Sequence, residues 1–116
     1  MDPSDARLPD ELEDEASPAS LEDAVLAAAA HLPGVVMRDA GQRREFIVGS
    51  RVVATLEAGV AEYLLDPAVA EAALRTPDTR RSAGAADRIA FEPRVLDRYA
   101  ADRAVAWFRS AVRGAG

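Results

Sequence analysis

The chain alternates between segments whose hydrophobic residues recur with a helical period and segments with the two-residue period of a strand. The first segment covers residues 21–32, where leucine, valine and alanine recur at helical spacing. Ser20 precedes it as a capping residue, with an acidic residue three positions later. A Pro-Gly pair at 33–34 ends the predicted helix, and a short strand over 35–37 follows.

Three strand-like runs come next, over residues 44–48, 51–57 and 60–65, and two-residue turns join them. Short turns of this kind between β-branched runs are typical of hairpins, so the pattern predicts an antiparallel meander. Its apolar residues fall into two sets, one made by Phe46 and Val48 and the other by Val52, Ala54 and Leu56. Apolar residues therefore occur on both faces, and we expect one face to be covered only partly.

The second half of the chain predicts two further helices and one strand. Asp66 and Pro67 open a helix that ends before Pro77, and a polar loop is expected over 77–87. A strand over 88–92 and a last helix over about 96–112 complete the domain. The aromatic residues are expected in the core (Phe46, Phe91, Trp107 and Phe108) or at its rim (Tyr63 and Tyr99). The predicted class is α+β, an antiparallel meander with helices packed on it in the order α-β-β-β-β-α-β-α.

Charge is distributed unevenly along the chain, whose net charge is −6. Residues 1–23 carry nine acidic residues against one arginine, whereas residues 24–116 carry eleven against thirteen arginines. The first segment has too few large apolar residues to offset the entropy lost on ordering, so residues 1–19 are predicted to be a disordered acidic leader. It is interpreted as a solubilising tail or as an acidic strip that covers the arginines. Residues 20–116 are expected to form one domain.

The composition excludes several classes of chemistry. The chain has no cysteine, no lysine and a single histidine, His31. Disulfides, thiolate metal sites and cysteine or lysine nucleophiles are therefore excluded, and a histidine metal cluster is not expected. No apolar run reaches the roughly 18 residues of a membrane span, and the acidic start fits neither a secretory signal nor a transit peptide. We therefore expect a cytoplasmic protein with no membrane partner.

Few residues of the domain suggest a chemical site. His31 ends the first helix without a nucleophile to serve, which favours a helix cap or a surface residue. Glu57 and Glu62 flank the turn of a hairpin, an ordinary pair at a solvated sheet edge, so no catalytic or metal site is predicted. The arginines are the feature that favours a charged partner. Phosphate or partner contacts are expected from six of them: Arg43, Arg44, Arg51, Arg80, Arg81 and Arg88.

Two related sequence patterns accompany these elements. The run Leu32-Pro33-Gly34-Val35, followed by Phe46-Ile47-Val48-Gly49, Arg51 and Ala54-Thr55-Leu56, resembles the MmcQ/YjbR-like family of small bacterial proteins. The run Arg44-Glu45-Phe46, with Gly49, Arg51 and Asp66-Pro67, is also similar to the small luciferase-domain proteins. The resemblance covers about residues 21–113 and implies a CyaY-like, double-wing type of fold with a DNA-binding role. The chain has Ala86-Asp87 where both patterns have Gly-Trp, and Ala54-Thr55-Leu56 where luciferase-domain proteins have histidines.

These observations together predict a non-enzymatic interaction or regulatory module with no cofactor and no metal ion. Its partner is expected to be another protein or a second copy of the chain. The alternative is weak DNA binding through the hairpin and loop arginines, although a charge of +2 over residues 24–116 falls short of a strongly basic balance. Arginines on one contiguous face would favour nucleic acid, whereas arginines paired with acidic residues would favour a protein partner.

Overall fold

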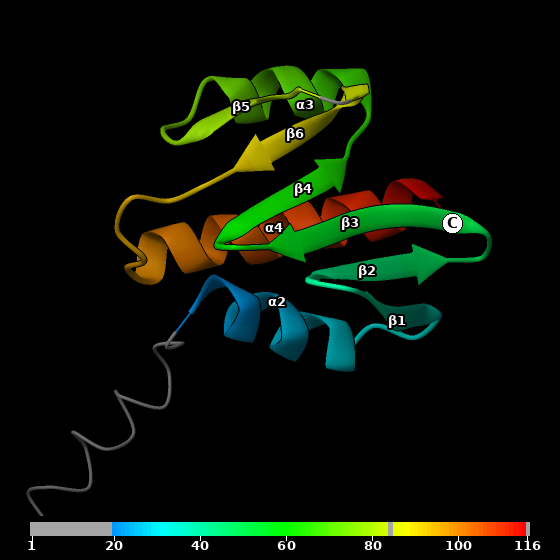
Figure 1. The fold of residues 1–116 in the computed structure, drawn as a ribbon. Helices are drawn as coiled ribbons and strands as arrows, with labels where there is room; N and C mark the ends of the chain where they lie inside the picture. The colour runs from blue at the N-terminus through cyan, green and yellow to red at the C-terminus, as the bar shows by residue number, and fades with distance from the viewer. Residues whose placement is uncertain (1–19, 84, 116) are drawn as a thin grey trace, which may run out of the picture.

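The protein is described by a computed structural model over residues 20–83 and 85–115, and the acidic leader predicted for residues 1–19 lies outside this part. Along the described chain the elements are α2 (Leu21–Ala30), β1 (Val35–Ala40), β2 (Arg43–Val48), β3 (Arg51–Glu57), β4 (Val60–Leu64), α3 (Pro67–Leu74), β5 (Thr79–Ser82), β6 (Ala85–Phe91) and α4 (Arg98–Ala115) (Figure 1). The strands form one antiparallel sheet in the order β1-β2-β3-β4-β6-β5. The predicted α+β class and the antiparallel meander are confirmed.

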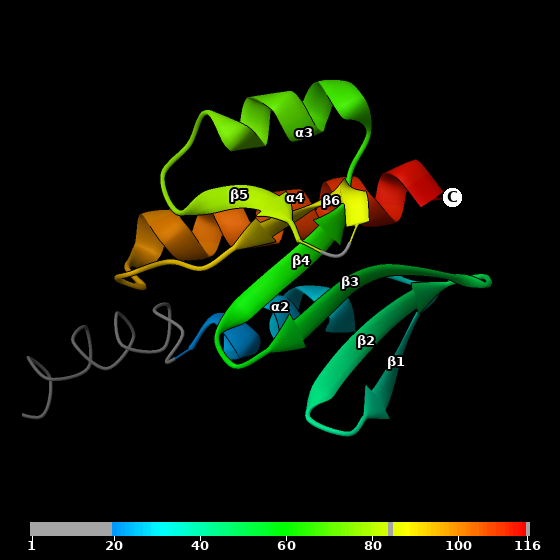
Figure 2. The same cartoon turned by 45° about the horizontal axis from the view of Figure 1, so that its top comes forward.

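The helices pack on one face of the sheet (Figures 1 and 2). α4 contacts the central strands β3 and β4, α3 contacts β5 and β6, and α2 packs against α4. The largest fully buried side chains are Tyr63, Phe46, Phe91 and Phe108. Alanines at positions 100, 104 and 111 lie on the buried face of α4 beside Phe108, and their small side chains let the helix lie close to the sheet.

Tyr63 lies in the centre of this core, and the prediction that it lies at the rim was wrong. Its side chain is fully buried, and its hydroxyl donates a hydrogen bond of 3.1 Å to the carbonyl oxygen of Ala104 on α4. Burial raises the pKa of the Tyr63 phenol well above its ordinary value, because the phenolate would lose its hydration. Tyr99, also expected at the rim, is 64% exposed. Trp107 is partly buried and packs edge-on against Phe91.

Local turn residues explain how the hairpins form. Gly49 has a φ of +65° at the first central position of the turn between β2 and β3, where a type II′ turn requires a positive φ. Ala58 and Gly59 both have positive φ, +53° and +80°, as a type I′ turn requires between β3 and β4. Ala58 carries a β-carbon in this left-handed region, which costs roughly 1–2 kcal/mol.

A β-bulge interrupts the alternation along β3. Phe46 pairs with Ala54 but Ile47 pairs with Val52, so Val53 is an additional residue on β3. Val53 is fully buried in the core, whereas Val52 lines the opposite face of the sheet. The prediction that Val52 belongs with Ala54 and Leu56 was therefore wrong, because one extra residue reverses the side-chain alternation.

The helix boundaries largely follow the predicted caps. The hydroxyl oxygen of Ser20 accepts a hydrogen bond of 3.0 Å from the backbone N–H of Asp23 at the start of α2. His31 is the C-terminal cap of that helix, and its side chain is exposed. Pro67 occupies the first turn of α3, although the Asp66 side chain makes no capping hydrogen bond. In residues 20–83 and 85–115, no helix is both long and apolar enough to cross a bilayer.

The segment over 77–87, which was predicted to be a polar loop, contains a strand. β5 pairs with β6 from Thr79 opposite Phe91 to Arg81 opposite Ile89. The hydroxyl of Thr79 also donates to the carbonyl oxygen of Ala73 at 2.7 Å, which ties β5 to α3. β1 likewise extends to Ala40, three residues beyond the prediction. Both are edge strands whose side chains are exposed or half-buried, so little apolar periodicity marks them.

Candidate functional site

The sheet has a second face, turned away from the helices, which we call the open face. Side chains alternate along each strand, and the register places Glu45, Thr55 and Glu62 side by side across β2, β3 and β4. The same row continues through Ala90 on β6 to Arg80 on β5. This row is on the side opposite Phe46, Ala54 and Tyr63, which face the helices.

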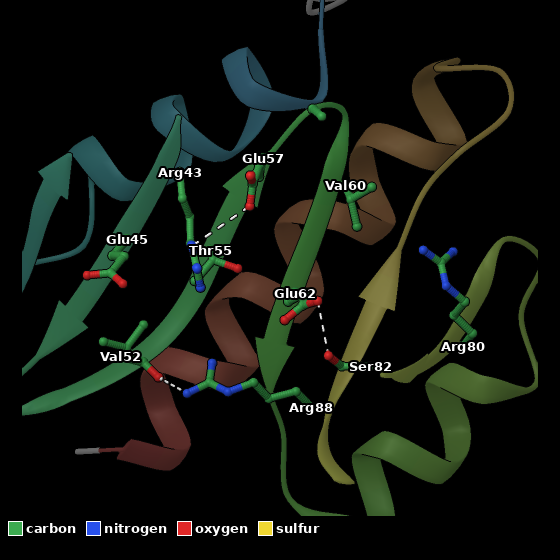
Figure 3. Close-up of a pocket in the computed structure, with 11 residues that line it drawn as sticks. Arg43, Glu45, Val52, Thr55, Glu57, Val60, Glu62, Arg80, Ser82 and Arg88 are labelled. Atoms are coloured by element: carbon green, nitrogen blue, oxygen red, sulfur yellow. Dashed lines mark hydrogen bonds and ion pairs between the residues drawn. The ribbon is translucent and has the colours of Figure 1, made fainter. Parts of the chain in front are cut away.

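The open face is hollowed by a depression of about 710 Å³, which we call the open-face hollow (Figure 3). Its lining comes from β2, β3, β4, β5, β6 and the turn after β3, and it consists of Arg43, Glu45, Val52, Thr55, Glu57, Ala58, Val60, Glu62, Arg80, Ser82 and Arg88. This volume lies in the range of roughly 300–1,000 Å³ that is typical of ligand sites, but the lining is far more polar than usual. Three arginines and three glutamates lie around it.

Arg88 is anchored at one side of the open-face hollow. One terminal nitrogen, Nη2, donates a hydrogen bond of 2.7 Å to the backbone oxygen of Val52 (Figure 3). The register between β3 and β4 ends at Ala54 opposite Tyr63, so β4 offers no paired residue to Val52. The other terminal nitrogen, Nη1, is buried and has no hydrogen-bond partner among the described residues. A buried donor left without an acceptor costs about 1–3 kcal/mol, so this nitrogen marks a position that favours an acceptor.

Arg43 reaches into the open-face hollow from the opposite side. The two guanidinium groups of Arg43 and Arg88 extend toward the middle of the hollow, with Glu45, Glu57 and Glu62 around them (Figure 3). Arg43 Nε lies 3.8 Å from Glu57 Oε1, and both side chains are about half exposed, at 52% each. An exposed ion pair of this length is worth little, so Arg43 can turn toward a ligand at small cost.

The carboxylates of the hollow each have a partner. Glu45 accepts a hydrogen bond of 3.0 Å from Arg38 Nε on β1. Glu62 accepts one of 3.0 Å from the Ser82 hydroxyl on β5. Glu57 pairs with Arg43 as described. The hollow therefore combines positive and negative groups in equal number, which differs from the uniformly positive surface that phosphates favour.

The six arginines predicted as contacts do not form one surface. Three of them, Arg43, Arg80 and Arg88, line the open-face hollow. Arg44 and Arg81 follow Arg43 and Arg80 by one residue, so alternation turns their side chains toward the helices. Arg44 pairs with Glu22 of α2 at 2.8 Å, and Arg81 pairs with Glu71 of α3 at 2.8 Å. Arg51 lies in a separate small depression with Asp66 and Asp87.

Two other titratable residues, His31 and Asp78, lie outside the hollow. His31 belongs to the helix side, at the end of α2. Asp78 accepts hydrogen bonds from the Nε and from the backbone N–H of Arg94, at 3.2 Å and 3.3 Å, and these bonds hold the pKa of its carboxyl below the usual value. Asp78 is thereby engaged in the turn before β5. Within the residues that the structure describes, no three His, Asp or Glu side chains are grouped to hold a metal ion.

Sequence reasoning missed the parts of the hollow that depend on tertiary structure. The hydrogen bond from Arg88 to the carbonyl oxygen of Val52 depends on the bulge and on the strand order. Neither of these produces a periodic pattern in the sequence. Ser82 belongs to the unpredicted strand β5. Glu57 and Glu62 do approach the same hollow, as their positions beside one hairpin turn indicated.

Comparison of the chain with protein-family models, curated proteins and solved structures finds no match. The similarity to the MmcQ/YjbR-like and luciferase-domain families therefore stays a prediction that rests on the quoted motifs.

Proposed function

We propose that the protein is a non-enzymatic interaction module, and that the open-face hollow binds a polypeptide partner through a carboxylate that the partner presents. The observation that carries the proposal is the buried Nη1 of Arg88, which lacks an acceptor among the described residues while Nη2 is held by Val52. A guanidinium fixed on one side and unsatisfied on the other is suited to a carboxylate oxygen, and because Nη1 is buried, binding there requires the groups that cover it to move aside. Arg43 supplies a second donor group from the other side.

The charge pattern supports a polypeptide rather than a nucleic acid. Residues 20–115 carry thirteen arginines and thirteen acidic residues, so the described domain has no excess positive charge. Glu45, Glu57 and Glu62 would repel successive phosphates of a DNA backbone, whereas they suit the N–H groups or basic side chains that flank a carboxylate in a polypeptide. Ion pairs also engage Arg44, Arg80 and Arg81 within the domain.

We propose no catalytic step because the polar groups of the open-face hollow are not arranged around a nucleophile. Ser82 is hydrogen-bonded to Glu62 on the open face, but the single histidine, His31, lies on the helix side. A serine nucleophile needs a base that is itself oriented by a third group. The described residues of the hollow do not provide this arrangement.

The test begins by selecting peptides from a displayed random library on the full chain. Selected peptides that contain Asp or Glu are then measured against wild type, Arg88→Gln and Arg43→Gln. Loss of one charge-assisted hydrogen bond should weaken binding about ten- to a hundredfold in Arg88→Gln. The matched control is Arg109→Gln, which removes the same charge from an exposed position on α4 and should leave binding unchanged.

A duplex DNA arm addresses the alternative of weak DNA binding through the arginines. Labelled duplex is titrated with the same proteins at low and at physiological salt. We expect no binding that depends on Arg88. Peptides that bind Arg88→Gln as tightly as wild type would contradict the proposal, and so would steeply salt-dependent DNA binding that Arg43→Gln and Arg88→Gln abolish.

A further inference from the structure

The first strand of the sheet has an unpaired edge. β1 is the outermost strand at one side, and among the described residues it pairs only with β2 (Figure 2). Five of its six residues are exposed. Its outer backbone N–H and C=O groups therefore form a row that is available to another strand.

The opposite edge of the same sheet, formed by β5, has features that discourage pairing with another strand, and β1 differs from it in length and in register. β5 has four residues, its pairing with β6 shifts register at Arg81, and two adjacent arginines occupy its centre. Short length, a bulge and charge are the features by which sheets discourage pairing with other chains. β1 has six residues in continuous register with β2 and contains no proline.

The charged residues of β1 are occupied within its own hairpin. Arg38 donates to Glu45, and Asp39 accepts from Arg44 Nε at 3.0 Å. Outside these pairs, Val36 and Met37 are the large apolar side chains of β1 that stay exposed, at 61% and 50%. Neighbours on a strand point to opposite faces, so a partner that covers one face of the sheet would cover only one of them. A strand added at the edge provides neighbours for both.

We propose that two copies of the chain associate by antiparallel pairing of their β1 strands about a two-fold axis. Such an axis keeps each residue on the same face of the joined sheet, so even-numbered residues lie opposite even-numbered ones and odd-numbered residues opposite odd-numbered ones. A register centred on Val36 or on Met37 places that residue opposite its own copy and keeps the arginines apart. A register centred on Arg38 would place two guanidinium groups directly opposite each other, which is unfavourable. The strand is therefore self-complementary at its apolar half, and the two six-stranded sheets would join into one.

This proposal is independent of the open-face hollow, because no residue of β1 lines the hollow. Its test is the oligomeric state of the full chain, measured by sedimentation equilibrium from low to high micromolar concentration. We expect wild type to be a dimer that dissociates on dilution. Val36→Lys should be monomeric, because each strand edge would then carry an added charge and lose its apolar contact. Val95→Lys is the matched control, since Val95 is 71% exposed outside the sheet, and it should dimerise as wild type does.

Cysteine variants give a second measurement that does not depend on destabilising the interface. The chain has no cysteine of its own, so a single introduced thiol can cross-link only to its copy. Opposed residues of an antiparallel pair have Cα atoms about 4.5–5.5 Å apart, which suits a disulfide. Val36→Cys or Met37→Cys should form a disulfide dimer under mild oxidation, and the faster of the two identifies the register. A monomeric wild type, equal dimerisation of Val36→Lys and wild type, or cross-linking no faster than in Val95→Cys would overturn the proposal.

Discussion

Raising the pH above 10 is expected to destabilise the fold through Tyr63. The phenol is fully buried, and burial raises its pKa above the ordinary value of 10.0, so the folded chain keeps the proton that the unfolded chain releases. The unfolded state then binds fewer protons than the folded state. The free energy of unfolding is therefore unaffected by Tyr63 below pH 10 and falls above it, by about 1.36 kcal/mol for each further pH unit.

The composition isolates this effect. The chain has no lysine or cysteine, and arginine stays protonated, so tyrosine is the type of side chain that ionises in the unfolded chain between about pH 9.5 and 11.5. Tyr63→Phe removes the titrating group together with one neutral hydrogen bond to Ala104, which costs about 0.5–1.5 kcal/mol at neutral pH. Wild type should lose about 1.4 kcal/mol by pH 11 while the variant loses nothing from this source. Their stabilities should therefore become equal between about pH 10 and 11.

The assay is urea unfolding followed by far-ultraviolet circular dichroism at a series of pH values from neutral to 11. Tyr99→Phe is the control, because Tyr99 is 64% exposed, and its profile should follow that of wild type. Parallel profiles for wild type and Tyr63→Phe above pH 10 would refute the reasoning, since they would mean that the buried phenol contributes nothing to the pH dependence.

Three further substitutions test local features by urea unfolding at neutral pH. Ala58→Asn should stabilise the fold by about 0.5–1 kcal/mol, because asparagine tolerates the positive φ of this turn; a loss of stability would contradict the turn assignment. Ser20→Ala should cost about 1 kcal/mol through the lost cap on Asp23, whereas Ser20→Asp should cost little. Phe108→Ala should cost about 3–5 kcal/mol, and a loss below 1 kcal/mol would show that the core is not packed around this ring.

The parts of the fold that the sequence predicted are those encoded by short-range signals. The turns after β2 and β3 and the breaks at both ends of α2 follow from residues that lie within a few positions of each other. β5 escaped prediction because Thr79–Ser82 contains no large apolar residue, and an edge strand needs none. The bulge at Val53 escaped because an alternating pattern does not reveal an extra residue until the partner strand is known.

In the candidate site, too, some features follow from short-range sequence signals and others depend on the tertiary structure. Alternation alone could have separated Arg43 from Arg44 and Arg80 from Arg81, since adjacent residues of a strand face opposite sides. The grouping of Arg43, Arg80 and Arg88 instead depends on the strand order β3-β4-β6-β5, which joins the meander to the later hairpin. No local signal in the sequence specifies that order. The unsatisfied nitrogen of Arg88 is likewise a property of the folded chain.

The last helix of the described chain, α4, packs both on the central strands and on the first helix, α2, so the core is completed late in synthesis. Strands β1 to β4 pair with near neighbours in sequence, so this meander can form while later residues are still being added. Its apolar side, with Phe46 and Tyr63, stays uncovered until α4 has been translated and has left the ribosome. Nascent chains that end before Arg98 should therefore expose the surface that chaperones bind, and release from them should follow synthesis of the last helix.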